Sequence, residues 1–176
     1  VGSFSYGLFN EKAEPETGEL PGVVVFTSGT TGSPKAVMQS HKSVCYQGAS
    51  QVISRNLTPD DALYIVAPIS VSIGLGSNLM ASVVAGAEAI LAMRFDPKTL
   101  AKAIVANEIS FMVAVPQVYN KLFDYAEANV INLGETKRLR VPGSGGAVID
   151  PAFSKRMKAI FGVPCSNGYG CTEMTP

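Results

Sequence analysis

A loop rich in hydroxyl groups and glycine, closed by a lysine, is the first place in this sequence where chemistry is concentrated. It occupies residues 27–35, TSGTTGSPK, directly after the apolar run 23–26, VVVF, which predicts a buried strand. Hydroxyls and backbone N–H groups of such a loop can point at one anion, and glycines allow close approach of a ligand. Lys35 adds a full positive charge. The residues that would form this anion site are Thr27, Ser28, Gly29, Thr30, Thr31, Gly32, Ser33 and Lys35.

The charges around this loop favour a phosphate ligand. No Asp or Glu occurs from Leu20 to Pro59, whereas Lys35, Lys42 and Arg55 lie in that stretch. The pattern is not a Walker A loop, which ends in Gly-Lys-Ser/Thr, because the last glycine here is followed by Ser-Pro. On composition alone, an ordinary Ser/Thr/Gly turn between two strands remains an equal alternative.

A second glycine motif, NGYGCTE at 167–173, follows late in the chain. The pair of motifs, in this order and separation, closely resembles the phosphate loop and the later nucleotide motif of the adenylate-forming superfamily. That superfamily includes acyl-CoA synthetases, adenylation domains of nonribosomal peptide synthetases and beetle-type luciferases. Two ordered motifs are far more specific than either alone.

The resemblance implies an enzyme that uses ATP to activate a carboxylic acid as an acyl-adenylate, followed by thioester formation with CoA or a carrier phosphopantetheine. It implies that Thr172 contacts the α-phosphate and that Glu173 binds Mg²⁺, in line with the preference of this ion for carboxylate and phosphate oxygens. Thr172 and Glu173 are thus the expected catalytic residues, and 27–35 the cradle of the β- and γ-phosphates. The residues expected beside adenine and the acyl group are Gly145, Gly146, Ala147, Asn167, Gly168 and Tyr169.

The sequence departs from the superfamily pattern at two places. Ala36 follows the loop lysine where the family usually has Gly, and the segment 68–74, PISVSIG, lacks the His or aromatic residue often found there. We therefore expect a smaller, more apolar acyl pocket around Val71 and Ile73.

The chain stops at Pro176, three residues after the second motif. By resemblance, the ribose-binding Asp and the mobile C-terminal domain with the catalytic lysine would lie beyond it, so we interpret the chain as a central fragment whose partner is that missing domain. A non-catalytic nucleotide-binding module and a scaffold fragment remain alternatives. The sequence does not identify the acid, and it does not separate a CoA ligase from a peptide-synthetase domain or a luciferase-like enzyme.

Composition limits the partners and the cellular environment that we expect for this protein. The 176 residues have no net charge, which gives no electrostatic support to a nucleic-acid or anionic-membrane partner, and no run of about 18 apolar residues predicts a membrane span. Only 16% of residues are charged, against about 25% in a typical domain, as expected if more chain or a partner covers part of the surface. Three cysteines without CxxC spacing favour reduced thiols in a cytoplasmic protein.

Strands and helices that alternate along the chain must position these motifs. Residues 1–22 predict a lead-in connection, and 23–176 a partial AMP-binding core of α/β class, with a largely parallel sheet flanked by helices. Asp-Pro pairs at 96–97 and 150–151 predict helix starts. Glycine-rich turns after Phe26, Val141 and Ser166 each follow a predicted strand, so we expect them to converge on one crevice. The predicted strands are 36–40, 62–67, 87–92, 111–115, 140–143 and 163–166, and the predicted helices are 43–54 and 73–84 and those that begin at 97, 116 and 151.

Overall fold

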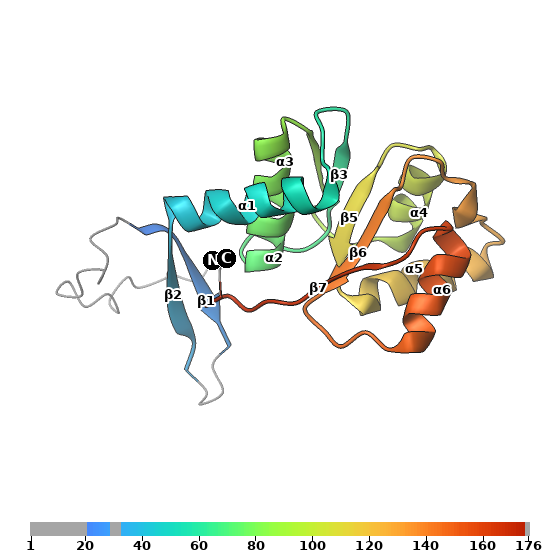
Figure 1. Ribbon diagram of the computed structural model, residues 1–176. Helices are drawn as coiled ribbons and strands as arrows, with labels where there is room; N and C mark the ends of the chain where they lie inside the picture. The colour runs from blue at the N-terminus through green and yellow to red at the C-terminus, as the bar shows by residue number, and fades with distance from the viewer. Residues whose placement is uncertain (1–20, 29–32, 175–176) are drawn as a thin grey trace.

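The computed structural model describes residues 21–28 and 33–174. A five-stranded sheet carries helices on both faces, and a two-stranded hairpin stands apart from it (Figure 1). The strands are β1 (Pro21–Thr27), β2 (Lys35–Ser40), β3 (Ala62–Ile65), β4 (Glu88–Leu91), β5 (Phe111–Ala114), β6 (Val141–Gly145) and β7 (Ser166–Gly168). The helical elements are α1 (His41–Arg55), α2 (Ser72–Gly74), η1 (Leu75–Met80), α3 (Ala81–Ala85), α4 (Pro97–Val105), α5 (Pro116–Ala128), η2 (Leu133–Glu135) and α6 (Pro151–Phe161).

The large sheet has the order β4-β3-β5-β6-β7, and every neighbouring pair of its strands is parallel. Successive strands are joined through helices, as parallel pairing requires. The predicted α/β class with a largely parallel sheet is therefore confirmed.

Two apolar cores lie on opposite faces of this sheet, and β5 contributes to both. Met112 and Ala114 pack into the larger core with side chains of α4, α5 and α6, whereas Phe111 and Val113 pack into the smaller core against α1, α2 and α3. This alternation follows from the two-residue period of a strand. The central strand is buried along its whole length, so it forms a rigid base for the sheet edge where its neighbours end.

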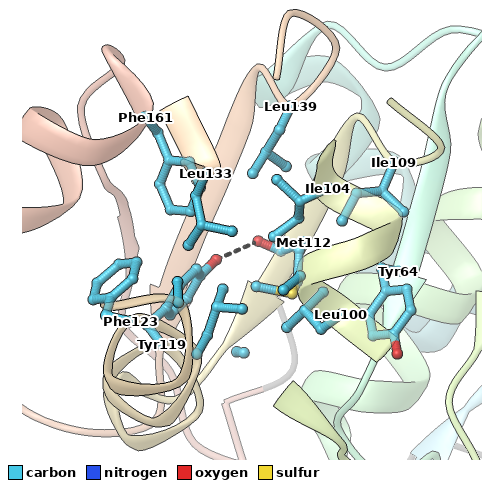
Figure 2. Close-up of a cluster of buried hydrophobic side chains, with 14 of the residues drawn as sticks. Tyr64, Leu100, Ile104, Ile109, Met112, Tyr119, Phe123, Leu133, Leu139 and Phe161 are labelled. Carbon is cyan, nitrogen blue, oxygen red and sulfur yellow. Dashed lines mark hydrogen bonds between the residues drawn. The ribbon is translucent and has the colours of Figure 1, made fainter. Parts of the chain in front are cut away.

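Tyr119 links α5 to the sheet within the larger core (Figure 2). Its hydroxyl lies 3.0 Å from the carbonyl oxygen of Met112 and 2.8 Å from that of Gly143, so it can donate to either. Burial raises the pKa of Tyr119 well above its usual value, so the group remains a hydrogen-bond donor. Tyr119 thereby holds β5 and β6 in register from the helix side.

The helix starts predicted from local chemistry are confirmed. The Asp96 carboxylate accepts from the backbone N–H of Thr99 at 3.0 Å, and the Asp150 carboxylate accepts from that of Phe153 at 2.6 Å. In both cases proline is the first helical residue, where its missing N–H costs nothing. These aspartates fix where α4 and α6 begin, and hence how each helix packs on the sheet.

The helix predicted over 73–84 is longer and less regular than expected. It runs from α2 through η1 to α3, and η1 has π-helical hydrogen bonding. Asn78 explains the irregularity, because its fully buried side chain donates to the backbone oxygen of Ile73 at 2.7 Å. A side chain that competes for a helix carbonyl in this way locally widens the turn.

Two strand predictions are wrong in their bounds. The strand predicted over 140–143 continues through Ser144 and Gly145, and the strand predicted over 163–166 begins only at Ser166 and includes Asn167 and Gly168. Glycine-rich sequence was interpreted as turn, but Gly145 pairs with Gly168 in the parallel ladder. The backbones approach so closely that a Cβ at Gly145 would lie 2.9 Å from the carbonyl oxygen of Gly168.

The first predicted strand is also not part of the parallel sheet. β1 pairs antiparallel with β2, with Thr27 opposite Lys35, and the two form a separate sheet. The expectation that three turns meet because they follow parallel strands of one sheet therefore fails for the turn after Phe26. The segments after β6 and β7 do follow neighbouring strands of the same sheet.

The cysteines agree with the prediction of reduced thiols. Cys45, Cys165 and Cys171 are all free thiols, and burial raises the pKa of Cys165 above its usual value. Within residues 21–28 and 33–174, none of the helices has the length and apolar character needed to cross a membrane.

Candidate active site

A pocket of about 360 Å³ opens where β6 and β7 end. Parallel sheets bind ligands at this carboxyl edge. Glycine is required at the floor of the site, because Gly145 packs against the backbone of Gly168 and Gly146 adopts a φ of 74°. The pocket is lined by Gln47, Gln51, Arg55, Val71, Ser72, Ile73, Ser77, Val113, Gly145, Gly146, Gly168, Tyr169, Gly170, Cys171, Thr172 and Met174.

The segment after β7 forms one wall of this pocket. Tyr169 stands at its rim with 93% of the residue exposed, so a flat ring face is available to a ligand. Thr172 is half-buried, and its backbone oxygen accepts a 3.0 Å hydrogen bond from the amide of Gln39 on β2. Gln39 itself is buried. The hairpin therefore anchors the second motif, as the approach of the C-terminal segment to β1 and β2 also indicates (Figure 1).

The described residues of the first motif belong to the hairpin and do not line the pocket. Thr27 ends β1, Ser28 follows it, and Lys35 begins β2 with an exposed side chain. None of these three is among the pocket residues. The remaining predicted loop residues, Gly29, Thr30, Thr31 and Gly32, lie outside the described residues.

Of the eight site residues predicted in the later segments, the structure brings five together in the pocket and leaves three outside it. Those in the pocket are Gly145, Gly146, Gly168, Tyr169 and Thr172. Ala147, Asn167 and Glu173 are exposed nearby and do not line it. Across the described part of the chain, no three His, Cys, Asp or Glu side chains gather as a metal-binding group. Glu173 thus offers a single accessible carboxylate.

The wall opposite the second motif was missed by the sequence analysis. Gln47, Gln51 and Arg55 all come from α1 and line the pocket together. Their spacing, i, i+4 and i+8, is a polar stripe on one helix face, and this was the signal available in the sequence. Val71 and Ile73 do line the pocket, and the α1 stripe adds two amides and a full charge to its wall. The smaller, more apolar acyl pocket stays a prediction.

Arg55 is held in place by neutral groups. Its Nε donates to the side-chain oxygen of Gln51 at 2.7 Å, and its Nη1 donates to the hydroxyl of Ser166. The guanidinium also lies over the ring of Phe111, 5.8 Å from the ring centre. Burial lowers the pKa of Arg55, because removal from water penalises its charge.

A buried ion pair fixes the end of α1 relative to the sheet. Asp61 is 5% exposed and contacts Arg140, whose Nε lies 3.1 Å from one carboxylate oxygen. Arg140 also donates to the backbone oxygen of Arg55 at 2.9 Å, so the same side chain closes the last turn of the helix. Burial acts to raise the pKa of Asp61, but hydrogen bonds from Arg140, Ser110 and Thr58 outweigh burial and hold this pKa below its ordinary value.

This fold and pocket define a class of protein: an α/β domain with a pocket at the carboxyl edge of a parallel sheet. The family model described as AMP-binding enzyme matches residues 5–176, so the chain belongs to the AMP-binding enzyme family. The predicted resemblance to adenylate-forming enzymes is thereby confirmed.

Individual relatives agree with the family. The chain is 28% identical over 163 residues to a mitochondrial malonate–CoA ligase from Xenopus laevis, covering 86% of this chain and 28% of that protein. It is 32% identical over 154 residues to a 2-succinylbenzoate–CoA ligase from Arabidopsis thaliana, covering 86% of this chain and 27% of the relative. The chain thus spans less than a third of the length of these curated relatives.

Solved structures with the same fold include MatB and the o-succinylbenzoate CoA synthetase MenE. Apo MatB from Rhodopseudomonas palustris superposes with a TM-score of 0.74 at 25% identity, over 85% of this chain and 29% of that one. MenE from Bacillus subtilis, in complex with the acyl-adenylate intermediate OSB-AMP, superposes with a TM-score of 0.73 at 25% identity, over 87% of this chain and 30% of that one. Both likenesses extend across most of the described elements.

Proposed function

We propose that the protein carrying this chain uses ATP to convert a carboxylic acid into an acyl-adenylate, and then transfers the acyl group to the thiol of CoA or of a carrier phosphopantetheine. The pocket between the ends of β6 and β7 is the observation that carries this proposal, because it gathers Gly145 from the Gly-Gly-Ala segment with Gly168 and Thr172 from the second motif. Membership of the AMP-binding enzyme family and the ligase names of the relatives support it.

In the proposed reaction a carboxylate oxygen of the acid bonds to the α-phosphorus of ATP, and pyrophosphate leaves. The protein contributes position and charge stabilisation rather than covalent chemistry. Thr172 would contact the α-phosphate, and Tyr169 with Gly168 and Gly146 would border the adenine and the acyl group. The phosphate loop, whose described residues are Thr27, Ser28, Ser33, Pro34 and Lys35, would hold the β- and γ-phosphates.

Magnesium fits this residue set as a substrate-bound ion. Mg²⁺ binds through one or two carboxylates and phosphate oxygens instead of an all-protein cage, and the exposed Glu173 follows the α-phosphate contact directly in sequence. Glu173 would hold the ion, which when bound neutralises charge on the phosphates. Ala147 and Asn167, exposed beside the pocket, complete the proposed nucleotide surface.

The test is acid-dependent exchange of labelled pyrophosphate into ATP by the natural full-length protein, with a broad panel of carboxylic acids. Glu173→Gln should lower the exchange rate about a hundredfold, the usual scale for loss of one group that stabilises transition-state charge. Glu88→Gln is the matched control, because Glu88 is an exposed residue of β4, at the opposite edge of the sheet from β7.

The two main outcomes are distinct. Exchange with at least one acid supports the proposal, and its loss in Glu173→Gln alone supports the role of that carboxylate. ATP binding without exchange for any acid would refute the proposal and favour a non-catalytic nucleotide-binding module.

A further inference from the structure

The polar stripe of α1 gives the pocket a charged end. Of the described residues that line the pocket, only Arg55 carries a full charge at neutral pH, and no Asp, Glu or Lys is among them. The ion pairs formed by the described residues, Arg140 with Asp61 and Arg156 with Asp124 and Glu127, do not involve Arg55. The guanidinium donates instead to the neutral oxygens of Gln51 and Ser166. A half-buried guanidinium beside a cavity thus retains an uncompensated charge.

The position of Arg55 is not explained by helix capping. An arginine in the last turn of a helix often binds the free carbonyl groups there. In α1, however, Arg140 donates to the backbone oxygens of Arg55 and Asn56, at 2.9 and 2.8 Å. The guanidinium of Arg55 is turned to the pocket side instead, where Gln51 fixes its Nε and orients the planar fork.

The charged end lies beside the start of the second motif, because Arg55 donates to Ser166 and its Nη2 would lie 3.9 Å from a Cβ on Gly168, but it lies away from Thr172. The backbone of Thr172 is bound by Gln39, two residues before α1 begins, whereas Arg55 is the last residue of that helix. A helix of 15 residues is about 22 Å long. The pocket therefore has one end at Thr172, where an acid would be adenylated, and a separate end at the guanidinium.

We propose that Arg55 receives a second carboxylate of the substrate, so that this site selects dicarboxylic acids over monocarboxylic acids. The proposal rests on the function proposed above, because it assigns the opposite end of the same acid. A guanidinium binds a carboxylate through two parallel N–H···O bonds, which gives geometry as well as charge. Gln51 is a positioning residue for this fork.

The test compares matched acids in the natural full-length protein: straight-chain monocarboxylic acids and the α,ω-dicarboxylic acids of equal length, in pyrophosphate exchange. The wild type should prefer the best dicarboxylic acid by about tenfold or more in kcat/KM, the scale of one charge-assisted pair. Arg55→Gln should abolish this preference, because kcat/KM should fall more for the dicarboxylic acid than for the monocarboxylic acid. Arg55→Lys should restore part of it, because charge remains without the planar fork.

Arg94→Gln is the control for loss of a positive charge, since Arg94 is exposed and outside the pocket. No preference in the wild type, or an equal loss with both acids in Arg55→Gln, would overturn the inference. A rise in KM for ATP alone would do the same, because it would place Arg55 against the nucleotide.

Calorimetric titration of the dicarboxylic acid in the absence of ATP separates this inference from the proposed function. If no acid supports exchange, the proposed function fails. Binding of the dicarboxylic acid that is lost in Arg55→Gln and kept in Arg94→Gln would still support the second carboxylate site. Binding that is equal in both variants, or absent in the wild type, would overturn it.

Discussion

Replacement of Asp61 by Asn should expose how strongly one ion pair ties α1 to the sheet. Asp61 accepts from the backbone N–H of Thr58 at 2.8 Å, from the Ser110 hydroxyl at 2.6 Å and from Arg140 through both carboxylate oxygens. An amide of the same shape must turn an NH₂ group toward at least one of the Arg140 donors. The substitution therefore breaks the ion pair without creating a cavity.

The magnitude follows from the burial of the two partners. Removal of one member of a buried ion pair costs about 3–5 kcal/mol. Asp61 is 5% exposed but Arg140 is 39% exposed, so solvent screens the released charge, and we expect about 2–3 kcal/mol. Hydrogen–deuterium exchange of peptides from β3 and β6 in the full-length protein should then become about 30- to 150-fold faster at amides that exchange only when this domain unfolds.

The pH dependence of this stability loss gives a second test, because its direction can be predicted. The pKa of Asp61 is lowered by folding, so its contribution is complete above the unfolded value of about 3.9 and is lost as pH falls through the lower folded value. The difference in melting temperature between Asp61→Asn and wild type should therefore be constant near neutrality and shrink only in strong acid. Asp60→Asn, one residue earlier and exposed, should change stability by less than about 0.5 kcal/mol. A similar effect of both variants, or a difference that grows in acid, would refute the reasoning.

Three further predictions concern the pocket and its support. Gly145→Ala places a Cβ 2.9 Å from the carbonyl oxygen of Gly168 and should cost about 1–3 kcal/mol with a fall in exchange activity, whereas Gly170→Ala, whose Cβ meets nothing within 4 Å, should keep the wild-type melting temperature. Tyr119→Phe removes the donor to two buried carbonyl groups and should cost about 1–2 kcal/mol in urea unfolding, with unchanged stability as the contrary result. Cys171 is exposed in the pocket, so Mg-ATP with an accepted acid should slow its alkylation but not that of the exposed Cys45 on α1; equal rates with and without ligand would count against the pocket as the nucleotide site.

The sequence by itself determined the class of fold and the ends of many elements. Asp96 and Asp150 mark helix starts, because a helix cap needs only residues within one turn. Short apolar runs mark strands, because the pattern of a buried strand is contained in its own few residues. The family could also be recognised, since its two motifs are contiguous stretches of sequence.

Tertiary structure decided what depends on partners distant in sequence. Gly145 belongs to a strand only because the backbone of Gly168 approaches it, and β1 belongs to a hairpin only because β2 pairs with it antiparallel. Likewise, the stripe that ends at Arg55 became a pocket wall only when α1 was placed against β7. The residues of a helix face do not determine which surface it packs against, because this depends on the packing of the whole domain.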